Sequence, residues 1–281
     1  MNQAMDNLDR IAYGRGFALE TYASLANLSI AERAIFQSLG PRIAGKRLLD
    51  IGVGGGRTTA FMLELSRDYT AIDYCEGFVD VVKAKFGLNS VYCCDVRDMS
   101  RFADEAFDFV LFSFNGLDYV SHEGRLKALA EINRVLRRDG LFVFSSHNRN
   151  RSEGRPKPRL VNDGETIVAG RWLKSKLKAA LLSPRHWLMR RYEVETSEYA
   201  IVNDDGRYYS LLTYYITLQK QIEQLKSLQF AVEGVYNVAG QFAGDNDQSP
   251  WLYYLASKRS DTSSTDRAPM RRAETIRWID K

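Results

Sequence analysis

A glycine-rich turn carries the clearest chemical signal in this sequence. Asp50-Ile51-Gly52-Val53-Gly54-Gly55-Gly56 follows a short apolar run and precedes a helical pattern. Glycines allow a tight turn, and they let backbone N–H groups approach a bound molecule closely. The spacing is GxGxG after an acid; it differs from the GxGxxG of dinucleotide sites and lacks the GK[ST] of a phosphate-binding P-loop. The turn predicts a site for a nucleotide-type cofactor.

The segment LLDIGVGGG (48–56) resembles motif I of the class I S-adenosylmethionine (SAM)-dependent methyltransferases, in which an acid and a hydrophobe precede GxGxG. The resemblance covers about residues 45–148 and, more weakly, 215–257. It implies a methyltransferase of the small-molecule type, with a Rossmann-like fold and SAM as its cofactor.

The resemblance also implies which residues bind SAM. Asp73 ends the second predicted strand, where the family places an acid on the ribose hydroxyls; a carboxylate can accept both hydrogen bonds. Asp95 ends the third strand, where an acid meets the adenine amino group. Asp50 could contact SAM or instead orient the loop by accepting backbone N–H groups. The expected cofactor-binding residues are Tyr13, Arg15, Asp50, Gly52, Gly54, Gly56, Asp73, Tyr74, Asp95, Val96, Phe114 and Asn115.

Methyl transfer from a sulfonium is an in-line displacement that needs alignment and, for an alcohol acceptor, a base. His147 ends the predicted fifth strand in FSSHN, and Asp118 follows the fourth in SFNGLDYV. The carboxyl ends of parallel strands form the ligand-binding edge of such sheets. His147 and Asp118 are therefore the candidate catalytic residues, with His147 the natural general base. A structural histidine beside the site is the alternative, and we expect no metal site.

Two signatures of DNA-base methylation are absent. The place of the Asp/Asn-Pro-Pro-aromatic tetrapeptide reads Phe114-Asn115-Gly116-Leu117, and no Pro-Cys nucleophile occurs. We therefore expect no DNA substrate, although RNA stays open.

Apolar runs that alternate with helical patterns must position these residues. Strands are predicted at 47–53, 69–74, 91–96, 107–114, 141–147, 230–238 and 251–257, with helices at 54–67, 76–86, 122–137 and 217–228. This alternation favours a parallel sheet that is covered on both faces. The predicted fold is α/β, a Rossmann-like seven-stranded, mostly parallel sheet with helices on both faces and an inserted α+β cap.

Four regions are expected along the chain. Residues 1–44 form a helical lid, in which a capping box of Ser29 and Glu32 begins a helix that Gly40-Pro41 ends. Residues 45–147 and 215–258 form the SAM-binding domain. Residues 148–214 form a cap with a β-hairpin, whose strands 192–202 and 207–214 flank an NDDG turn, and residues 259–281 form a flexible tail.

The cap is strongly basic. Between Arg149 and Arg191, twelve Lys and Arg residues stand against three acids, a net charge of +9 in a chain whose total is +4. Three interpretations remain open: a lid over a phosphate-bearing acceptor such as a nucleotide-linked sugar, a membrane-surface helix within 171–191, or a solvated cap with a dimer-forming hairpin.

Composition sets the outer limits. The chain has 281 residues, 45% hydrophobic and 26% charged, which is typical of a globular protein. Its apolar runs are short, its beginning has no apolar leader, and its three cysteines form no CxxC, so a cytoplasmic setting is expected. The predicted function is methyl transfer from SAM to a small molecule, favouring an O-acceptor such as a sugar or glycan precursor. N-methylation of a small amine or amino sugar, RNA methylation and non-catalytic SAM binding are the alternatives.

Overall fold

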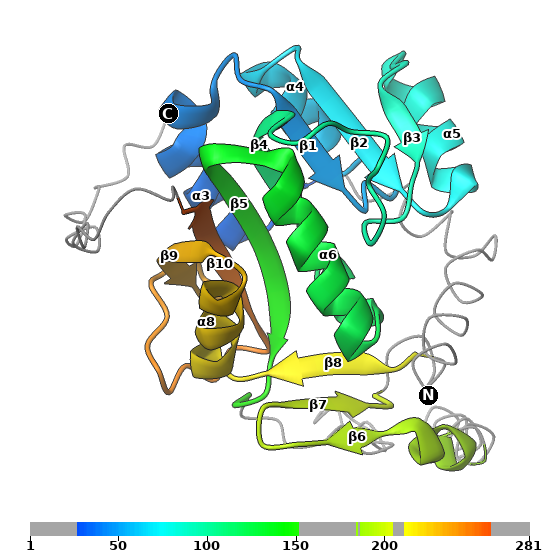
Figure 1. Ribbon diagram of the computed structural model, residues 1–281, viewed down its shortest axis with the longest axis vertical. Coiled ribbons are helices and arrows are strands. Elements are labelled where there is room, and N and C mark those ends of the chain that lie inside the picture. Colours follow the sequence, from blue (N-terminus) through cyan, green and yellow to red (C-terminus); the bar gives the residue numbers. More distant parts are fainter. Residues whose placement is uncertain (1–26, 152–183, 185, 205–210, 260–281) are drawn as a thin grey trace, which may run out of the picture.

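The computed structural model describes residues 27–151, 184, 186–204 and 211–259. A mixed sheet organises this part of the chain (Figure 1). Its parallel strands follow the order β3 (Val91–Cys93), β2 (Tyr69–Asp73), β1 (Leu48–Ile51), β4 (Phe107–Phe112) and β5 (Leu136–Asn148). Antiparallel β10 (Trp251–Lys258) pairs with β5, and β9 (Phe230–Tyr236) pairs with β10. The Rossmann-like α/β expectation is confirmed.

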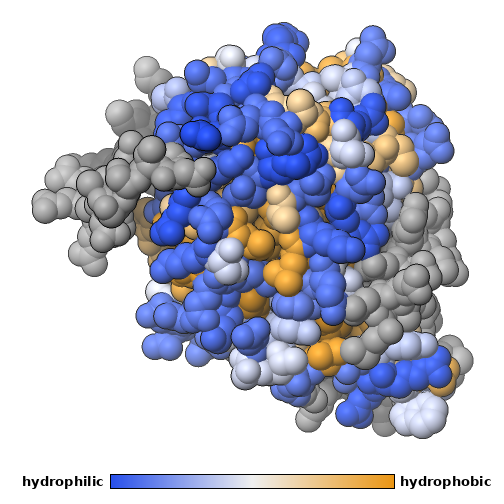
Figure 2. All heavy atoms as spheres, viewed as in Figure 1, coloured by the Kyte–Doolittle hydropathy of each residue, from blue (hydrophilic) through white to orange (hydrophobic). Residues whose placement is uncertain are grey.

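Helices cover both faces of this sheet. On one face, α6 (His122–Val135) and α8 (Leu218–Ser227) bury Leu129, Ile132 and Leu225 against the aromatic residues of β5 and β10. Figure 1 shows α8 and α6 on either side of β5, and Figure 2 shows the same face as mostly polar, with some apolar residues visible on it. On the other face, α3 (Ile30–Ile43), α4 (Thr59–Leu65) and α5 (Glu76–Phe86) contribute to a second apolar cluster.

The described part of the predicted cap continues the same sheet. The strand β8 (Thr213–Ile216) runs parallel to the tip of β5, where Tyr215 lies opposite His147. Next in the sheet, β7 (Tyr199–Val202) pairs antiparallel with β8, and β6 (Val194–Glu195) pairs antiparallel with β7. The short 3-10 helix η2 (Arg190–Tyr192) precedes β6 in the chain. The carboxyl end of β5 is therefore held by β10 on one edge and by β8 on the other, which fixes the backbone of His147.

Two local predictions are wrong. The segment 192–202 is two strands, because the Thr196 hydroxyl accepts the backbone N–H groups of Glu198 and Tyr199 and so closes a turn. The pairing of β7 with β8 across the NDDG segment is retained. Gly40-Pro41 does not end α3, which continues to Ile43 with its predicted capping box in place. A proline in the last turn removes only its own N–H, and the helix still buries Ile43.

Several predictions fall outside the described residues. These are the cofactor contacts of Tyr13 and Arg15, the tail from 260 onward, and the basic segment 152–183, which holds most of the predicted membrane-surface helix. In the part of the chain that is described, no helix has both the length and the apolar character needed to cross a membrane.

Truncating a core side chain of α6 should measurably destabilise the protein. Leu129 is fully buried, so Leu129→Ala is expected to lower the free energy of unfolding by about 2–5 kcal/mol through lost packing and a residual cavity. Urea unfolding followed by circular dichroism measures this change. The same truncation at Leu188, which is 50% exposed, should stay within about 0.5 kcal/mol of wild type. Equal effects of the two substitutions would contradict the assignment of this core.

Candidate active site

A cavity lies at the carboxyl ends of β1, β2 and β4, where the glycine-rich turn crosses from β1 toward α4. Gly52, Gly54 and Gly56 all have positive φ, at +64°, +52° and +78°. A Cβ on Gly52 would lie 2.9 Å from the Phe112 ring, and one on Gly56 would lie 2.6 Å from the Phe86 ring. A side chain at any of the three would therefore be strained, and one at Gly52 or Gly56 would also collide with its neighbour. Gly52, Gly54 and Gly55 line the cavity.

Asp73 ends β2 and lines this cavity. Its carboxylate accepts the backbone N–H of Gly54 and of Cys75, both at 2.9 Å, so it holds the glycine turn while each oxygen keeps further lone pairs. Burial raises the pKa of Asp73 to about 6, although these N–H groups lower it. The carboxylate is thus placed to accept ligand hydroxyls, and protonation in mild acid would weaken it as an acceptor.

Asp50 is buried beneath the turn and supports its start. Its Oδ2 accepts the hydroxyl of Thr58 at 2.6 Å and that of Tyr69 at 3.0 Å. Burial raises the pKa of Asp50 to about 6. These contacts agree with the loop-orienting interpretation of Asp50, although the residue also lines the cavity.

Other expected cofactor residues surround the same cavity. Tyr74, Asp95, Val96 and Phe114 all line it. Asp95 accepts a charge-assisted pair of hydrogen bonds from Arg97, with Nη2 at 2.6 Å from Oδ2, yet 37% of its side chain stays exposed. Asp73 and Asp95 thus follow β2 and β3, on one side of the glycine turn, and the β4 residues lie on its other side. The open glycine backbone and these two carboxylates fit the ribose and adenine of SAM.

A buried ion pair ties α3 to this cavity. Arg57, at the cavity wall, donates to both oxygens of Glu32, at 2.5 and 2.6 Å, and the Ser113 hydroxyl at the end of β4 donates to the same carboxylate. Burial alone would raise the pKa of Glu32, but Arg57 and Ser113 hold it below its usual value. The Arg57 guanidinium also lies 4.9 Å from the Phe114 ring centroid. Sequence reasoning found Glu32 only as a capping residue and missed Arg57.

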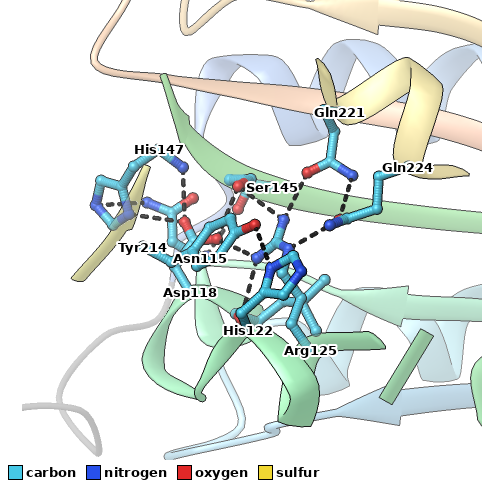
Figure 3. Close-up of polar contacts among 11 residues, drawn as sticks. Asn115, Asp118, His122, Arg125, Ser145, His147, Tyr214, Gln221 and Gln224 are labelled. Carbon is cyan, nitrogen blue, oxygen red and sulfur yellow. Dashed lines mark hydrogen bonds and ion pairs between the residues drawn. The ribbon is translucent and has the colours of Figure 1, made fainter. Parts of the chain in front are cut away.

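The structure brings the two candidate catalytic residues together. Asp118 lies in the 3-10 helix η1 (Gly116–Tyr119) after β4, and its Oδ2 is 2.7 Å from Nδ1 of His147 and 2.6 Å from the His147 backbone N (Figure 3). Its Oδ1 accepts the Ser146 hydroxyl and Nη1 of Arg125, at 2.7 and 2.6 Å. Asp118 is fully buried and its carboxylate already has four donors, so it orients His147 and is not itself exposed to an acceptor.

The second ring nitrogen of His147, Nε2, lies beside the Asn115 amide. Because Nδ1 faces the Asp118 carboxylate, a neutral ring carries its proton there and leaves Nε2 as the acceptor. Nε2 lies 3.4 Å from the amide nitrogen of Asn115. The rings of Tyr215, Tyr119 and Trp251 surround the imidazole, with centroids at 5.1, 6.2 and 6.4 Å. Tyr119 also lines the cavity, so it connects the imidazole to the cofactor side.

The backbone between β4 and η1 is strained, between the cavity and the Asp118–His147 pair. Phe114 and Asn115 have φ of +59° and +60°, which non-glycine residues rarely adopt. The Asn115 N–H donates to the Ser145 hydroxyl at 2.8 Å, which anchors this conformation to β5. The Asn115 amide oxygen is buried and has no hydrogen-bond partner among the described residues. Such strain is typical of functional loops.

Comparison with known proteins agrees with this geometry. Residues 49–144 match the model of the methyltransferase domain family. A ubiquinone biosynthesis O-methyltransferase of Sinorhizobium fredii is 28% identical over 49% of this chain and 60% of that protein, and a malonyl-[acyl-carrier protein] O-methyltransferase of Serratia marcescens is 27% identical over 71% and 76%. The chain spans less than two thirds of the first curated relatives it matches.

Solved structures share the fold. A 1,6-didemethyltoxoflavin-N1-methyltransferase of Burkholderia thailandensis, bound to its substrate and S-adenosylhomocysteine, superposes with a TM-score of 0.57 at 16% identity and covers 92% of this chain and 89% of its own. At this identity the likeness supports the architecture alone.

Removing one partner of the Glu32–Arg57 pair should cost more than removing both. Arg57→Met leaves a buried carboxylate without its cation and is expected to lower the free energy of unfolding by about 3–5 kcal/mol. The double variant Glu32→Gln/Arg57→Met should cost less, because no buried charge remains. Urea unfolding of both single variants and the double variant tests the coupling. Arg138→Gln, which removes a 62%-exposed side chain, should change little, and additive effects at positions 32 and 57 would refute the pair.

Proposed function

We propose that this chain, a member of the class I SAM-dependent methyltransferases, transfers the methyl group of SAM to a hydroxyl group of a small molecule, with His147 as the general base. The observation that supports the O-acceptor is the Asp118–His147 pair, which makes Nε2 of the imidazole a hydrogen-bond acceptor, here of the Asn115 amide, next to the cavity-lining Tyr119. An alcohol needs such a base, whereas an amine has to be only neutral.

In the proposed complex, the glycine turn and Asp73 hold the nucleoside part of the cofactor. Asp73 would accept the ribose hydroxyls, and Asp95 would face the adenine amino group. The residues at the end of β4, Phe114 and Asn115, would lie along the methionine part. SAM supplies a methyl group on a positively charged sulfur, which leaves as a neutral thioether when the acceptor oxygen attacks the methyl carbon.

The chain's own groups would then act on the acceptor proton. Nε2 of His147 would accept the hydroxyl proton, and the Asp118 carboxylate would stabilise the resulting imidazolium through Nδ1–H. Asp118 has no role as a second base in this proposal, because its carboxylate accepts four hydrogen bonds and is fully buried. It is therefore a positioning residue.

The acceptor is proposed as a hydroxyl compound with a flat or apolar face, which the rings of Tyr119, Tyr215 and Trp251 would contact. A sugar or glycan precursor and a phenol both have this character. A panel of sugars, phenols, amines and RNA, assayed by S-adenosylhomocysteine release, separates the classes of acceptor.

The basic cap supports three further proposals: a phosphate on the acceptor, membrane contact through 171–191, and a homodimer.

Loss of the Asp73 carboxylate should weaken SAM binding by about 1–3 kcal/mol, the range for removing a partner of charged hydrogen bonds. Isothermal titration calorimetry of Asp73→Ala against wild type measures this, with Asp68→Ala as a surface control of equal charge change. Because the pKa of Asp73 is about 6, wild-type affinity should fall as the pH drops below 6. An unchanged SAM affinity in Asp73→Ala would remove this cofactor assignment.

Loss of the His147 imidazole should slow turnover without loosening the cofactor. His147→Asn is expected to lower kcat for a hydroxyl acceptor by about 10²–10⁴-fold while SAM affinity stays at the wild-type value. His186→Asn is the matched control, since the His186 ring bonds Asn203, just after β7, and is not among the four donors to Asp118. An unchanged kcat of His147→Asn for a hydroxyl acceptor would contradict the role of His147 as the base. If His147→Asn kept the wild-type kcat only with amine acceptors, N-methylation would be favoured.

A further inference from the structure

A fully buried arginine stands behind the Asp118–His147 pair. Arg125 projects from the first turns of α6, and its side chain has no exposed surface. Each of its five N–H groups has an acceptor. These are Leu117 O, Asp118 Oδ1, Ser146 Oγ, Gln221 Oε1 and Gln224 Oε1, at 3.1, 2.6, 3.0, 2.6 and 3.1 Å. Figure 3 shows Asp118 on one side of the guanidinium and the two glutamines of α8 on the other.

The arrangement does more than fill the core. A buried ion pair is often no more stabilising than apolar side chains of the same volume, so stability alone does not account for one here. Four partners of Arg125 are neutral, and its single charged partner is the carboxylate that orients His147. The Tyr214 ring, 4.5 Å from the guanidinium carbon, closes the remaining face. The positive charge is therefore directed at Asp118.

Charge balance gives this contact a consequence for His147. With Arg125 in place, Asp118 and Arg125 sum to zero, and a proton on His147 would leave the buried cluster with a net positive charge. Without Arg125, the same proton would neutralise the Asp118 charge. A low-dielectric interior favours the neutral cluster in both cases. Arg125 thus opposes protonation of His147 before the acceptor arrives.

We propose that Arg125 is a positioning residue that neutralises Asp118, so that His147 keeps its orientation from the carboxylate and still enters the reaction as an uncharged proton acceptor. This inference rests on the proposed role of His147 as the base. It adds a function for a side chain that touches neither the cavity nor the acceptor.

The other groups around His147 leave this balance to Arg125. From η1 and the preceding turn, Asp118, Tyr119 and Asn115 face the imidazole; from β8 and β10, Tyr215 and Trp251 do. Behind Tyr215, Asp204 accepts its hydroxyl at 2.8 Å and Arg151 lies 4.9 Å from its ring centroid. These two groups carry opposite charges, and both contact Tyr215, not the imidazole.

Nuclear magnetic resonance can test the proposal without knowledge of the acceptor. The chain has three histidines, so ring-labelled histidine gives three titrations, and His147→Asn identifies the signal of His147. In Arg125→Gln, His147 should take up its proton at a pH higher by about one unit than in wild type. His122 should move in the same direction, because burial and then the Arg125 charge lower the pKa of that residue, and His186 should not move.

Two further variants keep the test sharp if Arg125→Gln folds poorly. Gln221→Glu keeps the size of the side chain but places a second carboxylate on Arg125, so His147 should again protonate at higher pH, by a smaller amount. Arg134→Gln is the control. Arg134 lies on the same helix and pairs with Glu131 and Asp104, away from Asp118, so His147 should titrate as in wild type.

The kinetic counterpart uses an acceptor found by the panel. In Arg125→Gln the acidic limb of kcat should move to higher pH, so that activity falls about tenfold on that limb and recovers in alkali. A purely structural role would lower kcat equally at all pH. If His147→Asn is inactive but neither the His147 titration nor the limb moves in Arg125→Gln and Gln221→Glu, this inference is overturned. If His147→Asn is fully active, the proposed base is overturned instead, and the titrations still decide whether Arg125 sets the charge state of His147.

Discussion

The arrangement of this site depends on one buried carboxylate. Asp118 is removed from water, and an ionised carboxylate in such a place is tolerated only when it is paired and hydrogen-bonded. Its donors come from two elements, Arg125 from α6 and Ser146 and His147 from β5, and Asp118 itself belongs to a third, η1. Satisfying this charge therefore fixes the turn after β4, the first turns of α6 and the end of β5 relative to one another.

The end of β4 joins that network to the cofactor side. Ser113 donates to Glu32, which pairs with Arg57 at the cavity wall, and two residues later the Asn115 N–H bonds Ser145 on β5. Between these two residues, Phe114 lines the cavity and adopts a left-handed backbone conformation that is unfavourable for a non-glycine residue. A few consecutive residues thus belong to both hydrogen-bond networks. This connection links His147, which does not itself line the cavity, to the residues of the cavity wall.

The sequence predicted local features well because these depend on local patterns. Short apolar runs between turn residues located the strands, and the spacing of Ser29 and Glu32 located the start of α3. Where prediction failed, another contact outweighed the pattern: a threonine hydroxyl broke the strand 192–202, and burial of Ile43 extended α3 past Pro41. The GxGxG turn and the acid after β2 were recognisable because their function requires fixed spacing.

Contacts between distant segments could not be read in the same way. Arg57 and Glu32 are 25 residues apart, and nothing in either neighbourhood marks the other as its partner. His147 and Asp118 were both named, but their separation by a helix and a strand hid the 2.7 Å contact between them. Arg125 left a detectable trace: with Ala128, Leu129 and Ile132 it follows the i, i+3, i+4, i+7 spacing of the buried face of α6. A charge on such a stripe indicates a buried partner.

The most direct test of the account is a crystal structure of the protein with S-adenosylhomocysteine bound. The account predicts the ribose hydroxyls on Asp73, the adenine beside Asp95, and the sulfur on the Phe114 and Tyr119 side of the cavity, with an acceptor-sized space between it and Nε2 of His147. A ligand bound elsewhere, or one whose sulfur is turned away from His147 with protein filling the intervening space, would contradict the account.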